Sequence, residues 1–343
     1  MPQDNTPLRI EISYKTVIFT VSVLIGLWFL IQIRQILVFV FFSIILLSAL
    51  LKPVEWLNVR RIPRVLSILF VYLILIAVIS FIVGIIIPPL ISQTSDFISK
   101  LPQIISKIND FLVFYQIPVQ NLSDILTRQI QAVIGNLISI STAIFSSIFL
   151  LITIFVFTFY LLLEHKSAIK FIASPFSGKQ EKKVSSAISK VEAGLGSWVR
   201  GQIALSFIVG ILIFIGLTIL QIPFALPLAL VAGLLEIVPI VGPIVSSIPA
   251  ILVGLTISPL IGLAIAALFF IVQQLENHLI VPVVMSKAVG LQPPVVILAL
   301  LIGAKLAGIG GAVLAVPTVV VARIIFREFL EEDQKFEDGL KEQ

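Results

Sequence analysis

The chain has 343 residues, of which 59% are hydrophobic and 12% charged, and its formal net charge is +5. Its mean hydropathy of +1.16 is far above that of water-soluble domains, which excludes an ordinary soluble fold. Cysteine is absent and the two histidines are far apart in the sequence, so we expect no disulfide, no cofactor and no bound metal.

Long apolar runs recur along the whole chain, beginning with residues 16–33 and 36–51 on either side of Arg34. We expect these two runs to form a tight hairpin, and the first to be a retained span because it lacks a signal-peptide cleavage site. In lipid only α-helices and closed barrels satisfy the backbone, and barrel strands would alternate in polarity. The sequence therefore predicts an all-α integral membrane protein with about seven to eight membrane segments. Further runs of adequate length cover residues 65–87, 138–163 and 203–220.

Basic residues are concentrated in two connections, KPVEWLNVRRIPR after the second run and residues 164–200. Residues 88–137 carry bases and acids in equal number, and form two apolar stripes at helical spacing whose simplest role is packing. Because cytoplasmic loops are rich in Lys and Arg, we expect a multi-pass protein of the cell (inner or plasma) membrane with both termini cytoplasmic. The loops explain the net positive charge, so nucleic acid is not implied.

Three charged residues remain inside apolar sequence of the C-terminal half: Glu236, Glu276 and Lys305. A charge at the centre of a bilayer costs about 2.5–3.5 kcal/mol on insertion scales, so such residues face a cavity, pair with one another or serve transport. The structural alternative is an ion pair of Lys305 with either glutamate, or a position close enough to the interface to reach water. The transport interpretation makes all three candidate substrate- or ion-binding residues.

Glu236 lies beside a predicted helix break at Pro239, Gly242 and Pro243. Proline removes a backbone donor and glycine loosens the turn. The apolar pieces on either side are shorter than the roughly 20 residues of a full crossing, which favours a re-entrant hairpin. Backbone groups freed at its tip could hold an ion or a polar solute, so these three residues are also candidates for the site.

A second broken element covers residues 291–326, where Lys305 precedes a glycine cluster that includes Gly310 and Gly311. Its spacing of charge, glycine and proline resembles that around Glu236, which indicates a weak internal repeat. If residues 259–283 cross the membrane once between the two elements, the hairpins enter from opposite faces and their tips meet near its middle. Gly310 and Gly311 are therefore further candidate residues.

A polar stripe ends the intervening span, formed by Gln273, Gln274, Glu276 and Asn277. Gln273 and Asn277 are four residues apart on one helix face, with Glu276 beside them. The stripe is a candidate lining of the binding site, and a solvated helix end is the alternative.

Several motifs together resemble the autoinducer-2 exporter family of membrane permeases, which also includes proteins described as sodium or lithium/proton antiporters. The resemblance covers nearly the whole chain and implies seven or eight membrane segments, a C-terminal transport core and a homo-oligomer. Lys305 departs from the small or apolar residue expected before the glycine cluster, and an ammonium there could neutralise a glutamate and disfavour cation binding. The motifs are KPVEWL, WVRGQ at Trp198–Gln202, LEIVPIVGP at Leu235–Pro243, QQLENHLIVP at Gln273–Pro282, VGLQPPVV and GIGGAVLAVP.

The expected function is secondary transport, because no nucleotide-binding loop motif is present. The transporter would export a small polar solute or exchange Na⁺ or Li⁺ for H⁺, with Glu236 or Glu276 as the proton carrier. An enzyme is not expected, since the spans contain no aspartate pair and no zinc-protease motif. A passive channel and a membrane scaffold or assembly protein without transport activity are the alternatives.

The chain divides accordingly into six segments. They are N-terminal membrane segments (1–87), an outer amphipathic helical insertion (88–137), a membrane span (138–163), a cytoplasmic helical segment (164–200), a C-terminal transport core (201–327) and an acidic cytoplasmic tail (328–343).

Overall fold

The computed structural model describes residues 14–88, 150–285 and 293–331, and the elements within these ranges are helices. Five of them are long and apolar enough to cross a membrane, and a sixth candidate is a pair bent by 79°. The predicted all-α multi-pass membrane architecture is confirmed. The total of seven to eight segments stays a prediction, and the predicted outer insertion lies outside the described residues. The five are Arg34–Val59 (α2), Arg64–Pro88, Lys179–Ile219 (α6), Pro259–Met285 and Pro294–Phe329, and the bent pair is Leu150–Leu163 with His165–Ala173 (α5).

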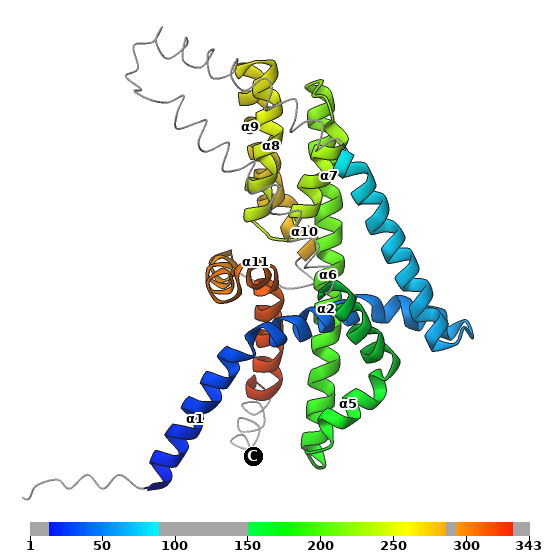
Figure 1. Cartoon of the computed structure of the whole chain (residues 1–343), viewed down its shortest axis with the longest axis vertical. Coiled ribbons are helices and arrows are strands. Elements are labelled where there is room, and N and C mark those ends of the chain that lie inside the picture. Colours follow the sequence, from blue (N-terminus) through cyan, green and yellow to red (C-terminus); the bar gives the residue numbers. More distant parts are fainter. Residues whose placement is uncertain (1–13, 89–149, 286–292, 332–343) are drawn as a thin grey trace, which may run out of the picture.

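The first two helices do not form the tight hairpin that the sequence suggested. Helix α1 (Tyr14–Gln32) leads into α2 through the single residue Ile33. The Ile33 amide donates to the Phe29 carbonyl and the Leu37 amide donates to the Ile33 carbonyl, both at 3.0 Å, so helical hydrogen bonding bridges the junction. The two helices point in different directions without folding back on each other (Figure 1). The prediction was wrong because one Arg–Gln step between two apolar runs does not require a turn.

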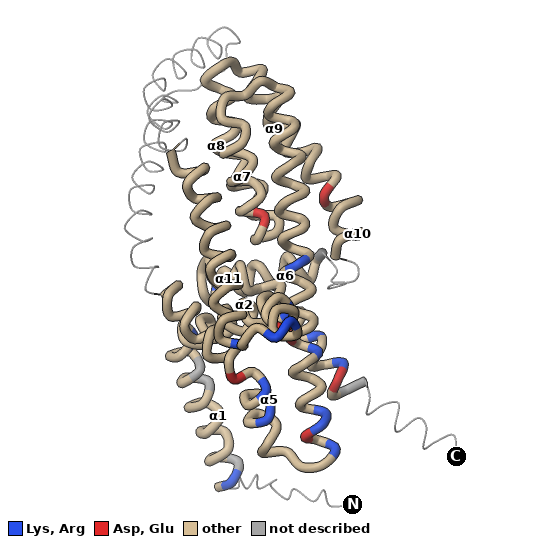
Figure 2. The backbone as a smooth tube through the Cα atoms, turned by 90° about the vertical axis from the view of Figure 1, so that its right-hand side faces the viewer, with Lys and Arg blue, Asp and Glu red and all other residues tan. Residues whose placement is uncertain are grey.

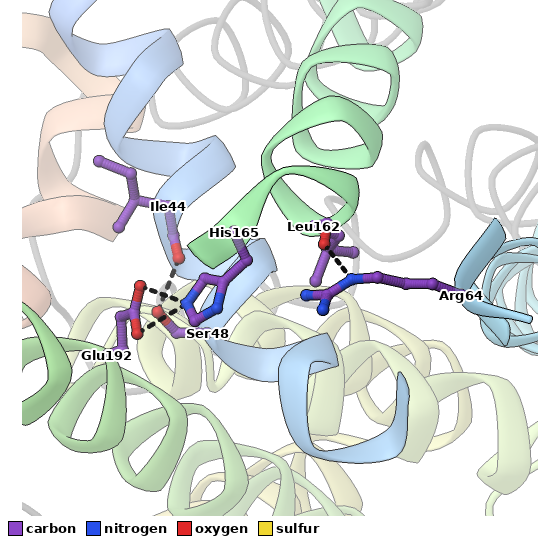
Figure 3. Close-up of polar contacts among 6 residues, drawn as sticks. All are labelled: Ile44, Ser48, Arg64, Leu162, His165 and Glu192. Carbon is purple, nitrogen blue, oxygen red and sulfur yellow. Dashed lines mark hydrogen bonds and ion pairs between the residues drawn. The ribbon is translucent and has the colours of Figure 1, made fainter. Parts of the chain in front are cut away.

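A cluster of buried side chains, which we call the N-terminal cluster, joins α2 to the helices Arg64–Pro88 and Leu150–Leu163. It consists of Leu47, Leu50, Val54, Leu57, Ile68, Val71, Tyr72 and Leu162. At its lower end, polar contacts fix the bend before α5 (Figure 3). Arg64 Nε donates to the carbonyl of Leu162 at 2.8 Å, which caps a helix end whose last carbonyls lack helical partners. His165 Nε2 lies 2.9 Å from Glu192 Oε1, which ties the start of α5 to α6.

Helix α6 is the central element of the molecule, a continuous helix of 41 residues. Its lower part carries the charged sequence and contacts α2, α5 and α11, while its upper part is apolar and packs against α7 (Figure 1). Trp198 is buried against Val316 and Val320 of α11. One helix therefore runs from the basic segment directly into an apolar span.

The upper bundle consists of α6, α7 (Ala225–Leu235), α8 (Val241–Ile257) and α9 (Pro259–Leu275), which share one apolar core. Helices α6 and α7 approach closely where Gly210 of α6 faces Gly233 of α7. A Cβ on Gly233 would lie 2.7 Å from the Ser206 carbonyl oxygen. Figure 2 shows Lys and Arg gathered in the lower half of the molecule around α5 and the lower part of α6. Between residues 201 and 285 the charged side chains are Glu236 and Glu276, so the acids of this bundle stand out against apolar surroundings.

Helix α11 (Pro293–Phe326) is broken at Ala307 and Gly308, and Gly308 has a φ of 60°. Its two halves run in different directions (Figure 1) and pass closely at two glycines: a Cβ on Gly303 would lie 2.3 Å from the Gly311 carbonyl oxygen. The predicted break in this element is therefore present. A short π-helix, Arg327–Glu331 (η2), follows, and Glu328 pairs with Lys190 of α6.

Candidate acidic site in the helix bundle

The break between α7 and α8 occurs where the sequence predicts it, around Pro239 and Gly242. Helix α7 ends at Leu235, and α8 begins after Ile240, whose φ of 70° is unusual for a β-branched residue. A Cβ on Gly242 would lie only 2.0 Å from the Leu235 carbonyl oxygen. The chain can therefore turn this tightly only with glycine at position 242.

Glu236 is the first residue beyond α7, and its side chain points into the protein interior. The residue is 1% exposed, and within the described part of the chain its carboxyl group has no side-chain partner other than the carboxyl group of Glu276. Glu276 lies beside it, near enough for the two carboxyl groups to interact electrostatically. The α7–α8 break thus contributes one acid, Glu236, and the end of α9 contributes the other, Glu276.

Glu276 begins a π-helical turn, Glu276–Ile280 (η1), between α9 and α10 (Val281–Met285). Gln273 Nε2 donates to Glu276 Oε2 at 3.1 Å, and Glu276 is 3% exposed. Single π turns inside α-helices are frequent at functional sites. Gln273 and Glu276 are three residues apart on one helix face and point inward together, whereas Gln274 and Asn277 are exposed. The polar stripe predicted along one face therefore divides into an inner pair and an outer pair.

A small cavity adjoins Glu276, and Glu236 is not among its lining residues. It leaves about 10 Å³ for the centre of a water-sized sphere, close to the minimum that one water molecule needs. Its polar lining comes from Ser246, Gln273 and Glu276, and Pro243 with apolar side chains of α6, α7 and α9 completes it. The Ser246 hydroxyl donates to the Pro243 carbonyl at 3.1 Å, which leaves its oxygen lone pairs toward further partners.

The candidate residues of α11 lie apart from this cavity. Helix α11 packs mainly on α6 and α2, and Gly310 approaches Val38 and Phe42 of α2. These contacts do not support the predicted meeting of the two broken tips. Lys305 is exposed, and among the described residues it forms no ion pair with Glu236 or Glu276.

Gln202 of α6 also belongs to the site, although the sequence motifs did not predict it. It is 5% exposed, and its Nε2 donates to the backbone carbonyl of Glu236 at 2.6 Å. That carbonyl belongs to the end of α7, where helical partners run out. The available signal was a glutamine inside an otherwise apolar stretch of α6. We call Glu236, Glu276, Gln273, Ser246 and Gln202 the acidic core.

Replacing Gln202 with leucine is expected to lower transport about tenfold. A buried carbonyl left without its donor costs on the order of 1–3 kcal/mol, and loss of this hydrogen bond frees the turn that carries Glu236. The informative companion is Gln202→Glu. A protonated carboxyl can donate to the Glu236 carbonyl and an ionised one cannot, so transport by this variant should fall with rising pH more steeply than wild type. Matching pH profiles for wild type and Gln202→Glu would contradict the positioning role.

Within the described ranges no three His, Asp or Glu side chains cluster in a way that could hold a metal ion. The cavity instead has one carboxyl group, one amide and one hydroxyl around a space of one water molecule, and the second carboxyl group, that of Glu236, lies beside Glu276. Oxygen ligands of this kind suit hard cations and protons.

Comparison with known proteins gives the family. Residues 17–331 match the family model described as "AI-2E family transporter". Two proteins of Bacillus subtilis (strain 168) are similar over most of both chains. "Putative transport protein YrrI" is 29% identical over 298 residues, covering 83% of this chain and 84% of the relative. "Putative transport protein YueF" is 29% identical over 309 residues, covering 82% and 81%.

A more distant relative extends the match further along the chain. "Putative transport protein MT0215" of Mycobacterium tuberculosis (strain CDC 1551 / Oshkosh) is 26% identical over 318 residues, covering 90% of this chain and 86% of its own. The resemblance noted from the motifs is thereby confirmed. Because the family match takes in nearly all of the described helices, the chain belongs to the AI-2E transporter family and is a multi-pass membrane transporter.

Proposed function

We propose that this protein is a secondary transporter in which a proton and a monovalent cation alternate at Glu236 of the acidic core. The observation that supports this most directly is the carboxyl group of Glu236, which is 1% exposed and, within the described residues, has no side-chain partner other than the neighbouring acid Glu276. A buried carboxylate without a partner is costly. The group therefore requires a bound proton or a bound cation in each stage of a transport cycle.

Glu276 makes simultaneous ionisation of both acids still less favourable, because two like charges in an apolar bundle repel each other. A cation between them would remove that repulsion. Gln273 supplies an amide oxygen and Ser246 a hydroxyl oxygen on the cavity that Glu276 lines. Exchange of Na⁺ or Li⁺ for H⁺ follows if the cation displaces the proton from Glu236 on one side of the membrane and the proton displaces the cation on the other.

The size of the cavity favours an ion over an organic solute in this conformation. About 10 Å³ for the centre of a water-sized sphere accommodates one water molecule or one dehydrated small cation. Export of a small polar solute would require the α7–α8 break to open further. Lys305 does not weaken the cation proposal, since it is exposed and no described contact joins it to either acid.

The proposal includes the cell (inner or plasma) membrane, both termini on the cytoplasmic side, and a homo-oligomer. The positive charge around α5 and the lower part of α6 supports the orientation, because cytoplasmic loops carry the excess of Lys and Arg (Figure 2). Transport here involves no covalent chemistry, in keeping with a transporter family.

Everted membrane vesicles that hold a pH gradient test the proposal. Proton release after a pulse of Na⁺ or Li⁺ is compared between vesicles with the wild-type chain, vesicles with Glu236→Gln and vesicles without the chain. The proposal expects release only with the wild type. Flux far above carrier rates would indicate a passive channel, and equal responses in all three preparations would contradict cation exchange and direct the search to organic solutes.

A further inference from the structure

An apolar groove of about 560 Å³ lies between the helices Arg64–Pro88 and Leu150–Leu163, remote in sequence from the acidic core. Tyr72 forms its rigid floor: the ring meets Phe155 edge-on at 5.1 Å between centroids, and the hydroxyl donates to the Phe155 carbonyl at 2.9 Å. The groove therefore offers aromatic surface in which the Tyr72 hydroxyl is already hydrogen-bonded. Its lining includes Tyr72, Ile76, Leu151, Phe155, Phe159 and Tyr160.

The turn that precedes the first of these helices carries three arginines, Arg60, Arg61 and Arg64, which we call the arginine turn. Arg60 lies over the ring of Trp56, with 3.6 Å from its guanidinium carbon to the ring centroid. Arg64 reaches the other helix through its bond to Leu162, and within the described chain its Nη2 is buried without a hydrogen-bond partner. The arginine turn thus stands at one end of the groove, and no ion pair with a described acid neutralises its positive charge.

The length of the groove fits one leaflet of a bilayer. Tyr160 is two residues from Leu162, at the level of the arginine turn, where amphipathic aromatic rings favour the membrane interface. Ile76 and Leu151, at the other end, lie roughly 16–18 Å along their helices from Arg64 and Leu162. Half of a hydrocarbon core measures about 15 Å.

We propose that this groove binds an anionic phospholipid, with its phosphate at the arginine turn and an acyl chain along the aromatic floor. Charge complementarity selects an anionic headgroup, because arginine pairs strongly with phosphate oxygens and basic side chains beside a span attract anionic lipids. The apolar lining selects an acyl chain over a polar ligand. The bound lipid bridges the helices Arg64–Pro88 and Leu150–Leu163 and so stabilises the N-terminal cluster.

Native mass spectrometry of the purified full-length chain, titrated with phosphatidylglycerol or phosphatidylcholine, tests the proposal. Wild type should retain phosphatidylglycerol in preference to phosphatidylcholine. Arg64→Gln should weaken phosphatidylglycerol binding about tenfold, as expected for loss of one charged hydrogen bond, and Arg64→Lys should keep most of it. Ile76→Trp fills the groove and should reduce retention of both lipids.

Two matched variants complete the test. Phe70→Trp introduces the same indole side chain at an exposed position of the same helix outside the groove, and Lys179→Gln removes a distant exposed charge. Both should bind phosphatidylglycerol as wild type does. Wild-type lipid binding by Arg64→Gln and Ile76→Trp would overturn the proposal. Loss of subunit assembly in Ile76→Trp with lipid retention unchanged would also overturn it, because the groove would then hold a second copy of the chain.

Discussion

Vesicles containing Glu236→Gln are expected to exchange Na⁺ or Li⁺ for H⁺ on the order of 100-fold more slowly than wild-type vesicles, the scale on which a positioned proton carrier contributes. Glutamine keeps the volume of the side chain but cannot release a proton or neutralise a bound cation. Within the described residues Glu276 is the one side-chain partner of the buried wild-type carboxyl, and the glutamine amide can still donate a hydrogen bond to it, so the replacement removes no hydrogen bond that holds the fold. The loss should therefore appear in transport and not in stability.

The comparison variant is Glu181→Gln, which removes an exposed acid from the first turn of α6. It should exchange cations at the wild-type rate. Thermal unfolding in detergent should give similar transition temperatures for both variants and the wild type. Retained exchange in Glu236→Gln would refute a role for Glu236 in the transport path.

Gly242→Ala is expected to lower the free energy of unfolding by about 3 kcal/mol, the upper part of the range for inserting an atom into a filled site. The added Cβ would stand 2.0 Å from the Leu235 carbonyl oxygen and 2.5 Å from its carbon, both backbone atoms that cannot rotate away. The α7–α8 break must then open, which displaces Glu236 as well. Thermal or denaturant unfolding of the purified protein measures the change.

Gly84→Ala is the control for this substitution, since a Cβ at Gly84 would meet nothing within 4 Å. Alanine also favours a helix over glycine by roughly 1 kcal/mol, so this variant should be as stable as wild type or slightly more stable. A Gly242→Ala protein as stable as Gly84→Ala would show that the break does not have the tight geometry described.

The sequence predicted the elements whose cause is local. Pro239 and Gly242 interrupt a helix through a missing donor and a missing side chain, and the break is present between α7 and α8. The glycine cluster after Lys305 predicted the second break in the same way. The placement of Glu236 and Glu276 in apolar sequence was enough to nominate them together, because a buried charge is costly wherever it lies.

Features that depend on packing or register could not be read from the sequence. The contact of Gln202 with the Glu236 carbonyl joins residues on different helices, and nothing in the local pattern of α6 specifies it. Asn277 is exposed although helical spacing grouped it with Gln273, because the neighbouring helices cover the face of Val272 and Glu276. The direction of the second half of α11 is likewise set by its packing on α2 and α6.

Carbodiimide labelling of Glu236 in everted vesicles, followed by peptide mass spectrometry, is the most direct test that this carboxyl group takes the transported ion. The reagent modifies protonated carboxyl groups, so a cation that displaces the proton should slow the modification. The account predicts that labelling of Glu236 falls with rising Na⁺ or Li⁺ over the concentration range that drives proton release. Labelling that stays constant across that range while protons are released would place the transport path elsewhere.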